Sequence, residues 1–169
     1  MSDAAASDAN SLAARLGSAD PGMRQAAAER LARMGEDAAP AAAALVFACG
    51  DADERVREQT VAALEDLGPP RADAIGQLIG LVPHADPLVA YWATTLLGRA
   101  GEDAASAVPA LTGCLASRAD LSVRQRTAWA LGKIGPAAAS AREALGRAAN
   151  DADPRLARLA NEALAAIGA

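Results

Sequence analysis

Apolar and polar positions along this chain repeat with a nearly constant step. Aspartates stand at positions 20, 53, 86, 120 and 153, and glycines at 35, 68, 101, 135 and 168, so both series advance by 33, 33, 34 and 33 residues. A period of this length is typical of stacked helical repeats. Positions within a copy are numbered below by their offset from the aspartate.

Each copy opens with a predicted amphipathic helix, helix A. Offsets 3, 7, 11 and 14 carry apolar or small residues and fall on one helical stripe. The aspartate is expected to cap the helix N-terminus, and the glycine at offset 15 to stop the helix in a left-handed conformation. Offset 11 is always leucine: Leu31, Leu64, Leu97, Leu131 and Leu164.

A second predicted helix, helix B, follows each glycine except the last. Its N-caps are expected at Asp73, Ser106 and Ser140, the last in a capping box with Glu143, and at Asp37 in the first copy. Offset 25 is leucine in every full copy: Leu45, Leu78, Leu111 and Leu145. The pattern therefore predicts an all-α fold, a right-handed α-α superhelix of helical hairpins of the armadillo or HEAT kind.

Short motifs make the chain resemble HEAT repeats, most closely the bacterial HEAT-like subclass named after phycobilisome lyases. The motifs are Asp-x-x-Val-Arg at 53–57 and 120–124, Leu-Gly-x-Ile-Gly at 131–135 and Ala-Val-Pro-Ala-Leu at 107–111. The resemblance covers about residues 11–169. It implies the fold and little about function, because the family's motif residues are mostly structural.

The resemblance also implies a ladder of Asp–Arg pairs between repeats. Arg24, Arg57 and Arg124 share offset 4, whereas Ala90 and Ala157 replace arginine in the third and fifth copies. We expect the ladder to be interrupted there. A row of phosphate-binding arginines is the alternative function for this offset.

The repeat frame sets the expected domain organisation. A disordered tail, residues 1–9, precedes a single solenoid, residues 10–169. The terminal helix has no helix B after it and is expected to leave Leu156, Leu159 and Ile167 partly uncovered, which fits a monomer or a weak end-to-end dimer. The parts of the solenoid are a half-repeat at 10–19, repeats at 20–52, 53–85, 86–119 and 120–152, and the terminal helix at 153–169.

Amino-acid composition limits the kinds of core and the kinds of partner that this chain can have. The chain is 52% hydrophobic but only 2% aromatic, which suits a thin core of closely packed helices. Its net charge of −5 argues against nucleic-acid binding. No apolar run predicts a secretory signal or a membrane span. Cys49 and Cys114 are expected to be small buried hydrophobes rather than a disulfide, so we expect a reducing cytoplasm.

Few residues suggest chemistry. His84 is the one histidine and falls in a predicted turn, so no metal-ligand cluster and no nucleophile–base pair is evident. The carboxylates at 36–37 and 102–103 are expected to stabilise helix starts rather than to act as an acid–base pair. We therefore expect no catalytic, cofactor or metal site, and a protein that is not an enzyme.

Two surfaces are candidates for binding a protein partner. Tyr91 and Trp129 should point outward from helix A, and Trp92 should wedge between neighbouring A helices. These aromatics are either a binding patch or packing residues. The second surface is a shallow groove on the B helices, and its candidates are Phe47, Gln77, Gly80, Gly113, Glu143 and Arg147. Glycines there permit close approach by another chain or by a neighbouring helix.

The leading hypothesis is a protein-binding scaffold or adaptor without catalytic activity. A bilin-lyase-like or chaperone-like HEAT subunit is the alternative, and it rests on the resemblance alone. A HEAT-like DNA-binding or repair protein is less favoured, because the chain is acidic and shows no basic, aromatic-lined cleft.

Overall fold

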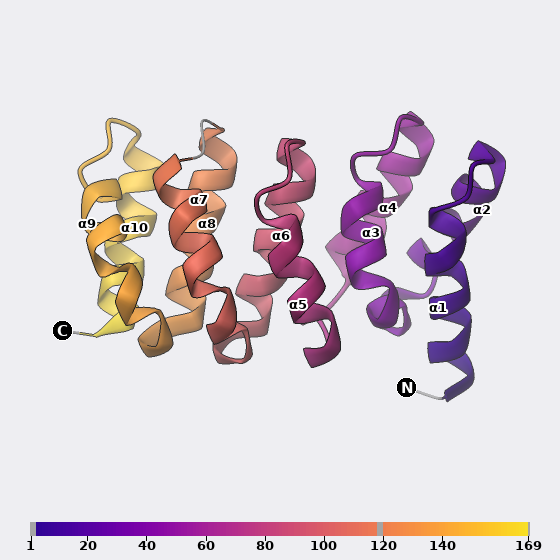
Figure 1. Cartoon of the computed structure of the whole chain (residues 1–169), viewed down its shortest axis with the longest axis horizontal. Coiled ribbons are helices and arrows are strands. Elements are labelled where there is room, and N and C mark those ends of the chain that lie inside the picture. The colour runs from indigo at the N-terminus through magenta and orange to yellow at the C-terminus, as the bar shows by residue number, and fades with distance from the viewer. Residues whose placement is uncertain (1–2, 118–119, 169) are drawn as a thin grey trace. The chain divides into compact units, whose positions relative to one another are not determined.

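The computed structural model describes residues 3–117 and 120–168, in which every regular element is a helix (Figure 1). The α-helices are α1 Asp3–Leu16, α2 Pro21–Ala32, α3 Ala42–Ala48, α4 Glu54–Asp66, α5 Ala72–Leu81, α6 Pro87–Ala100, α7 Val108–Ser117, α8 Leu121–Ile134, α9 Arg142–Ala148 and α10 Pro154–Ile167. The 3₁₀ helices are η1 Gly35–Ala41, η2 Gly101–Ala107 and η3 Gly135–Ala141.

The chain forms two compact units, Met1–Gln77 and Leu78–Ala169. In the first unit, α2 packs on α4 while α1 and α3 pack on each other and on those helices. In the second unit, α6, α8 and α10 form one layer and α7 and α9 the other (Figure 1). This all-α architecture of layered helical hairpins is the predicted α-α superhelix class. That residues 10–169 form a single solenoid, divided as above, stays a prediction.

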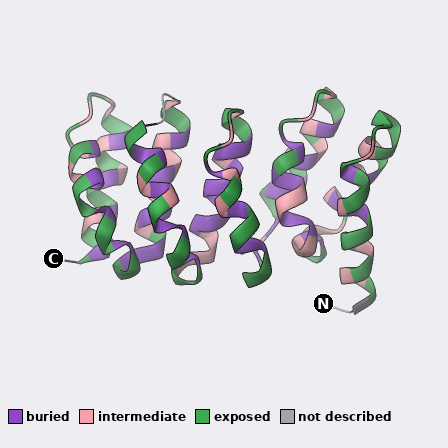
Figure 2. Cartoon of the chain, in the orientation of Figure 1, coloured by how far each residue is buried: buried purple, intermediate pink, exposed green. Residues whose placement is uncertain are grey.

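Leucine stripes form the core, as the period predicts. Figure 2 shows buried residues concentrated where the helices of a unit meet one another. Fully burying one leucine contributes about 1.5–3 kcal/mol, so these positions dominate the packing energy. The leucines at offsets 11 and 25 with no exposed surface are Leu31, Leu64, Leu97 and Leu131, and Leu45, Leu78, Leu111 and Leu145.

Two expected core positions lie at the ends of the array and are uncovered. Met23 is 45% exposed, because only α1 precedes its repeat. Leu164 is partly exposed, whereas Leu156, Ala160 and Ile167 of the same stripe are buried. Burial along the stripe is therefore less uniform than the period predicts.

All five aspartate N-caps are confirmed. Each aspartate has an extended backbone, and its carboxylate accepts a hydrogen bond from an amide of the first helical turn. Asp20 Oδ1, for example, lies 2.8 Å from the amide nitrogen of Gly22. The proline that follows the aspartate begins α2, α6 and α10, where its missing N–H removes no hydrogen bond.

The predicted left-handed glycine stop holds for four copies and is wrong for Gly68. Gly35, Gly101, Gly135 and Gly168 have φ between 54° and 87°, whereas Gly68 does not have a positive φ. The helix before Gly68, α4, ends at Asp66, and its C-cap residue Leu67 has an extended backbone (ψ 126°). A residue that precedes proline favours an extended conformation, and Gly68 precedes Pro69.

The predicted side-chain caps of the B helices are wrong. Asp37, Ser106 and Ser140 lie inside η1, η2 and η3, and α3 and α9 begin without a side-chain cap. Because each 3₁₀ helix runs directly into its α-helix, i→i+3 bonds of the 3₁₀ turn occupy the amides that a cap would satisfy. Asp73 lies in the first turn of α5, which begins one residue before it.

The terminal predictions also need correction. Residues 3–9 of the predicted disordered tail are helical instead, since alanine-rich sequence favours helix and Ala9 packs in the core, whereas residues 1 and 2 lie outside the described residues. At the other end, Leu156 and Ile167 are buried where α10 packs on α8 and α9, and Leu159 is partly exposed. The uncovered apolar surface of α10 is therefore smaller than predicted.

Candidate functional site

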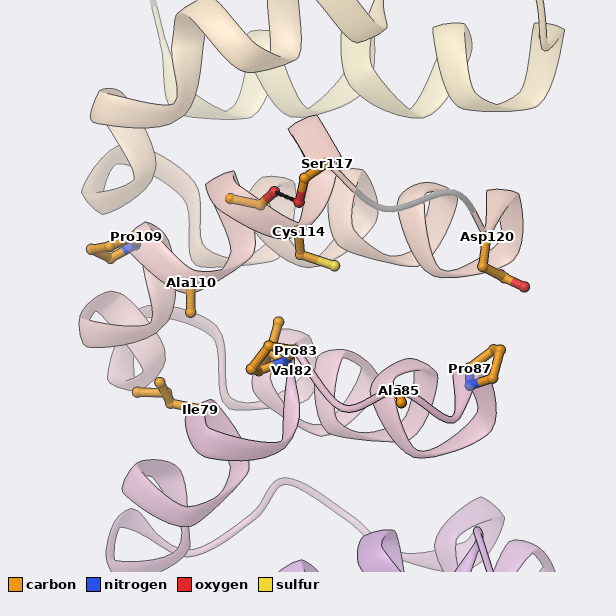
Figure 3. Close-up of a pocket in the computed structure, with 11 residues that line it drawn as sticks. Ile79, Val82, Pro83, Ala85, Pro87, Pro109, Ala110, Cys114, Ser117 and Asp120 are labelled. Atoms are coloured by element: carbon orange, nitrogen blue, oxygen red, sulfur yellow. Dashed lines mark hydrogen bonds between the residues drawn. The ribbon is translucent and has the colours of Figure 1, made fainter.

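A pocket of about 630 Å³ opens in the second unit between the turn after α5 and helix α7 (Figure 3). We call it the B-side pocket. From α7, Ala110 and Cys114 point toward Val82 and Pro83 across the opening. Its lining comprises Ile79, Val82, Pro83, Ala85, Pro87, Pro109, Ala110, Gly113, Cys114, Ser117 and Asp120.

The B-side pocket owes its width to small residues on α7. Gly113 is exposed, and a Cβ added there would meet nothing within 4 Å. Pro109 lies one turn earlier, where the missing N–H costs little because it is close to the helix start. A larger side chain at either position would project into the opening. The local sequence therefore leaves room beside α7 for a group from another molecule.

The chemistry of the B-side pocket is that of apolar binding. Asp120 is the single acidic group among the eleven described lining residues, which include no histidine, lysine or arginine. The Asp120 carboxylate accepts hydrogen bonds from the Val123 amide at 3.0 Å and from the Ser122 hydroxyl at 2.6 Å. The Ser117 hydroxyl donates to the Gly113 carbonyl at 2.7 Å. Polar groups at the rim are thus engaged in local structure.

The groove predicted on the B helices corresponds only in part to this pocket. Of its candidates, Gly113 lines the pocket, whereas Gly80 does not. Glu143 and Arg147 form an i,i+4 ion pair on α9. The other two candidates, Phe47 and Gln77, belong to the first unit; both are exposed, Phe47 to 61%. A binding role for any of these residues stays a prediction.

The predicted aromatic residues come together on the helix-A layer of the second unit. Tyr91 and Trp129 are partly exposed, and Arg126 lies between them. Its Cζ atom is 4.6 Å from the centroid of the Tyr91 ring and 4.9 Å from that of Trp129, and Nη2 donates a hydrogen bond to the Tyr91 hydroxyl. Cation–π contacts of this kind contribute about 0.5–1 kcal/mol each at exposed sites.

Further cations join this cluster. The Nζ atom of Lys133 lies 5.9 Å from the Trp129 ring. A shallow pocket of about 180 Å³ brings Arg155 of α10 to the same surface as Tyr91 and Trp129. We define the outer aromatic patch as Tyr91, Arg126, Trp129, Lys133 and Arg155. Sequence reasoning found its aromatics but missed its cations, although Arg126 and Lys133 lie three and four residues from Trp129, on the same helical face.

Trp92 belongs to the core rather than to the outer aromatic patch. It is 7% exposed, as expected for a residue wedged between A helices. The Tyr91 ring meets it edge-on at 5.8 Å, and the Arg99 guanidinium lies 5.7 Å from its centroid. Trp92 therefore supports the patch from beneath without being available to a partner.

Interior glycines set the spacing of this layer. A Cβ at Gly98 of α6 would come within 2.3 Å of the Trp129 ring, and a Cβ at Gly132 of α8 within 3.1 Å of the Ala163 backbone. The repeat period alone does not predict a packing role for these two glycines. A signal exists, because both stand at offset 12 inside a helix, where glycine costs about 1 kcal/mol against alanine and needs a packing reason.

Two Asp–Arg pairs involve offset 4, but each joins residues of one repeat rather than of neighbouring repeats as expected: Arg24 with Asp51 and Arg124 with Asp151. The Arg24 guanidinium donates to both carboxylate oxygens of Asp51, at 2.7 and 2.9 Å. Burial would raise the pKa of the Asp51 carboxyl, but hydrogen bonds from Arg24 and from the Asp53 amide outweigh it and lower that pKa below its ordinary value. These arginines are held by carboxylates, which favours the structural role over phosphate binding.

The other two arginines at offset 4, Arg124 and Arg57, bind different kinds of acceptor. Arg124 donates to Asp151 at 2.7 Å, and the pKa of that carboxyl is likewise lowered, first by the Asp153 amide and then by Arg124. Arg57 instead donates to the backbone carbonyls of Asp51 and Ala52 at 2.8 and 3.1 Å. The arginines at offset 4 thus stabilise the turns of the repeats by donating hydrogen bonds either to an aspartate carboxylate or to backbone carbonyls.

The remaining candidate residues have local roles. His84 Nδ1 accepts from the Asp86 amide at 3.2 Å, in the position where Asp51 and Asp151 accept from the next N-cap residue. Cys49 and Cys114 are buried thiols, as predicted. No cluster of three or more His, Cys, Asp or Glu suited to a metal ion occurs among residues 3–117 and 120–168. None of the described helices has the length and apolarity needed to cross a membrane.

Comparison with solved structures supports the fold. An engineered protein matches with a TM-score of 0.64 and 23% identity, covering 94% of this chain and 78% of its own. The complex of CpcE and CpcF of phycocyanin lyase from Nostoc sp. PCC7120 matches with 0.67 and 23%, covering 95% of this chain and 65% of that one. A designed armadillo repeat protein in complex with the peptide (KR)4 matches with 0.61 and 20%, covering 90% and 79%.

Comparison of sequences identifies the family. A search of curated proteins found no match. A family model described as HEAT repeats matches residues 40–132 and 76–165, which overlap and together span most of the chain. The motifs that resemble HEAT repeats of the phycobilisome-lyase type agree with this match and with the structural likeness to the lyase complex. The chain therefore belongs to the family of HEAT repeat proteins.

Proposed function

We propose that this protein is an interaction module without catalytic activity, and that it holds a protein partner through the B-side pocket. The observation that carries the proposal is an open, mostly apolar pocket of about 630 Å³ between two successive repeats. This volume falls within the range of about 300–1,000 Å³ that is usual for binding pockets. HEAT repeats supply the scaffold, and the pocket supplies the place for a partner's side chain.

The expected occupant is a large apolar side chain presented by a peptide segment. Ile79, Val82 and Ala110 offer apolar contacts, and Cys114 adds a polarisable sulfur. Desolvating an aromatic or leucine side chain in such a pocket is what makes a binding hot spot. The rim gives few charged contacts, so we expect the apolar anchor to supply most of the affinity.

The lining argues for binding rather than catalysis. A general base must reach the proton that it removes, and a nucleophile needs an activating base. Asp120 is the one carboxylate of the described lining, and its oxygen already accepts two hydrogen bonds at the start of α8. Cys114 is 7% exposed, and the Thr127 hydroxyl donates to its sulfur at 3.6 Å.

A pocket-filling variant tests the proposal. Peptides would be selected on the wild-type protein from a random library, and we expect a consensus with one large apolar residue. Gly113→Leu should weaken their binding at least tenfold, because the new side chain occupies the B-side pocket. It should not unfold α7, since replacing an exposed helical glycine gains about 0.8–1 kcal/mol.

Gly146→Leu is the matched control. Gly146 lies on α9, lines none of the described pockets, and has nothing within 4 Å of an added Cβ. The selected peptides should bind this variant as tightly as the wild type. Peptides that bind Gly113→Leu unchanged, or a selection that yields no apolar consensus, would contradict the proposal.

A second candidate function is a lyase-type or chaperone-like subunit. The likeness to the phycocyanin lyase complex is the observation that favours it. Such a subunit should retain a linear tetrapyrrole after incubation with one and gel filtration, giving visible absorption in the protein fraction. A colourless protein fraction would count against this candidate and leave the interaction module.

A further inference from the structure

We infer that the outer aromatic patch binds an acidic peptide segment of a protein partner, one that carries an aliphatic side chain beside its carboxylates. The patch lies on the helix-A layer of the second unit, whereas the B-side pocket lies beside the helix-B layer. The two surfaces share no residue. The inference therefore stands independently of the function proposed above.

The central group is a guanidinium held in place before any ligand arrives. Arg126 is stacked against Tyr91 and Trp129, and Nη2 donates to the Tyr91 hydroxyl. No other hydrogen-bond partner of this guanidinium occurs among the described residues. Arginine's planar fork matches a carboxylate in two parallel hydrogen bonds, and a fork already fixed by stacking loses less entropy on binding.

Neighbouring cations are likewise uncompensated. Lys133 and Arg155 form no ion pair with any described carboxylate. Among the other exposed arginines described in this unit, Arg147 pairs with Glu143 and Arg158 with Glu162, whereas Arg142 donates to the Gly168 carbonyl. The outer aromatic patch is thus a place where positive charge is concentrated and open to a ligand.

Charge is distributed unevenly along the chain. Residues 1–77 hold seven Lys or Arg against thirteen Asp or Glu, whereas residues 78–169 hold nine against eight. The helices α6, α8 and α10 carry six cations, against Glu162 and the three N-cap aspartates, Asp86, Asp120 and Asp153. A positive helix layer on an acidic protein attracts anionic groups locally, and such charge complementarity speeds association and selects partners.

An apolar recess adjoins the cations. A pocket of about 240 Å³ that Trp129 also lines is bordered mainly by small and aliphatic residues, together with Lys133 and Glu162. Its apolar lining is Ala128, Gly132, Leu159, Ala163 and Ala166. The small volume suits an aliphatic side chain next to a carboxylate.

An acidic peptide fits these observations better than a nucleic acid. Stacking of bases requires open aromatic faces, and Arg126 already occupies one face of the Tyr91 ring and one face of the Trp129 ring. A short segment with a few carboxylates and one aliphatic residue needs no aromatic face for stacking.

Fluorescence anisotropy with defined probes tests the inference. The probes are a labelled peptide of Asp and Glu around a central Leu, the same peptide with Asn and Gln, and a short single-stranded oligonucleotide. We expect the acidic peptide to bind most tightly and its affinity to fall as NaCl rises from about 0.05 M to about 0.5 M. The double variant Arg126→Gln/Lys133→Gln should weaken it about tenfold.

Controls separate recognition from folding and from general charge. Arg55→Gln removes an exposed cation of α4 in the first unit and should leave the affinity unchanged. Circular dichroism should show that the double variant keeps its helix content, since Lys133 is exposed and Arg126 partly so.

Three outcomes would overturn the inference. These are equal binding of the neutral peptide, tighter binding of the oligonucleotide, and an acidic peptide that fails to bind or that binds the double variant unchanged. The Gly113→Leu experiment reports on the B-side pocket separately, so either surface can fail while the other stands.

Discussion

Replacing Gly98 by alanine tests how closely α6 and α8 approach each other. The new Cβ would lie 2.3 and 2.9 Å from two atoms of the Trp129 ring and 3.0 Å from the Ala130 Cα. Carbon atoms in favourable contact are about 3.5–4.0 Å apart. The ring, which Arg126 covers on its outer side at 4.9 Å, must therefore move by about 1 Å or the two helices must separate.

Two opposing effects decide the size of the change. Alanine gains about 1 kcal/mol over glycine inside a helix. Overpacking of a well-packed core costs about 1–3 kcal/mol, and the upper part of this range applies because one of the three contacts is with backbone. The net effect should be a loss of about 1–2 kcal/mol in the free energy of unfolding.

Urea unfolding followed by circular dichroism measures this loss. Gly113→Ala is the matched control, since nothing lies within 4 Å of its Cβ, and it should gain about 0.5–1 kcal/mol. In a Trp129→Ala background, most of the loss caused by Gly98→Ala should vanish. A stabilisation by Gly98→Ala, or an equal loss in both backgrounds, would refute the close packing of Trp129 on α6.

Two further predictions concern ion pairs and helix stops. Because the pKa of the Asp51 carboxyl is lowered in the folded state, its contribution to stability is present above about pH 4, the ordinary value, and is lost as the pH falls through the lowered one. Arg24→Gln should raise the Asp51 pKa, measured by NMR titration, and an unchanged value would show that Arg24 does not stabilise the carboxylate. Gly135→Ala should cost about 1–2 kcal/mol because φ is +70°, whereas Gly68→Ala should be close to neutral. Equal costs in thermal unfolding would contradict the difference in backbone conformation.

Much of the fold could be predicted because its determinants are local and repeated. An aspartate cap and a leucine stripe each depend on residues of a single helix. The repeat period therefore predicts an N-cap at the position of Asp20 in all five copies and a buried leucine at the position of Leu31. Some positions depart from the pattern that the period predicts. Pro69 changes the stop at Gly68, and Met23 is exposed and Leu164 partly exposed although both stand on the apolar stripe.

The start of the B helices could not be predicted from cap residues. Serine at 106 and 140 and aspartate at 37 are good caps in isolation. In the protein a 3₁₀ turn already satisfies those amides, and its alanines, such as Ala104 and Ala138, are buried against neighbouring helices. The position at which each B helix starts is therefore set by tertiary packing, and the sequence of that helix alone does not predict it.

The candidate surfaces were predictable only in part. Offsets placed Tyr91 and Trp129 outside and Trp92 inside, because direction around a helix follows from position. The stacking of Arg126 between two rings depends on two helices from different repeats, so spacing within one repeat does not reveal it. The same holds for the B-side pocket, which requires the turn after α5 to lie opposite α7.

An NMR titration of the labelled protein with a library-selected peptide would locate the bound partner residue by residue. We expect the largest amide shift changes at residues 79–87 and along α7, centred on Ala110 and Gly113, with no turnover of the peptide. Shift changes confined to other helices, or chemical conversion of the peptide, would contradict a non-catalytic module that binds through its B-side pocket.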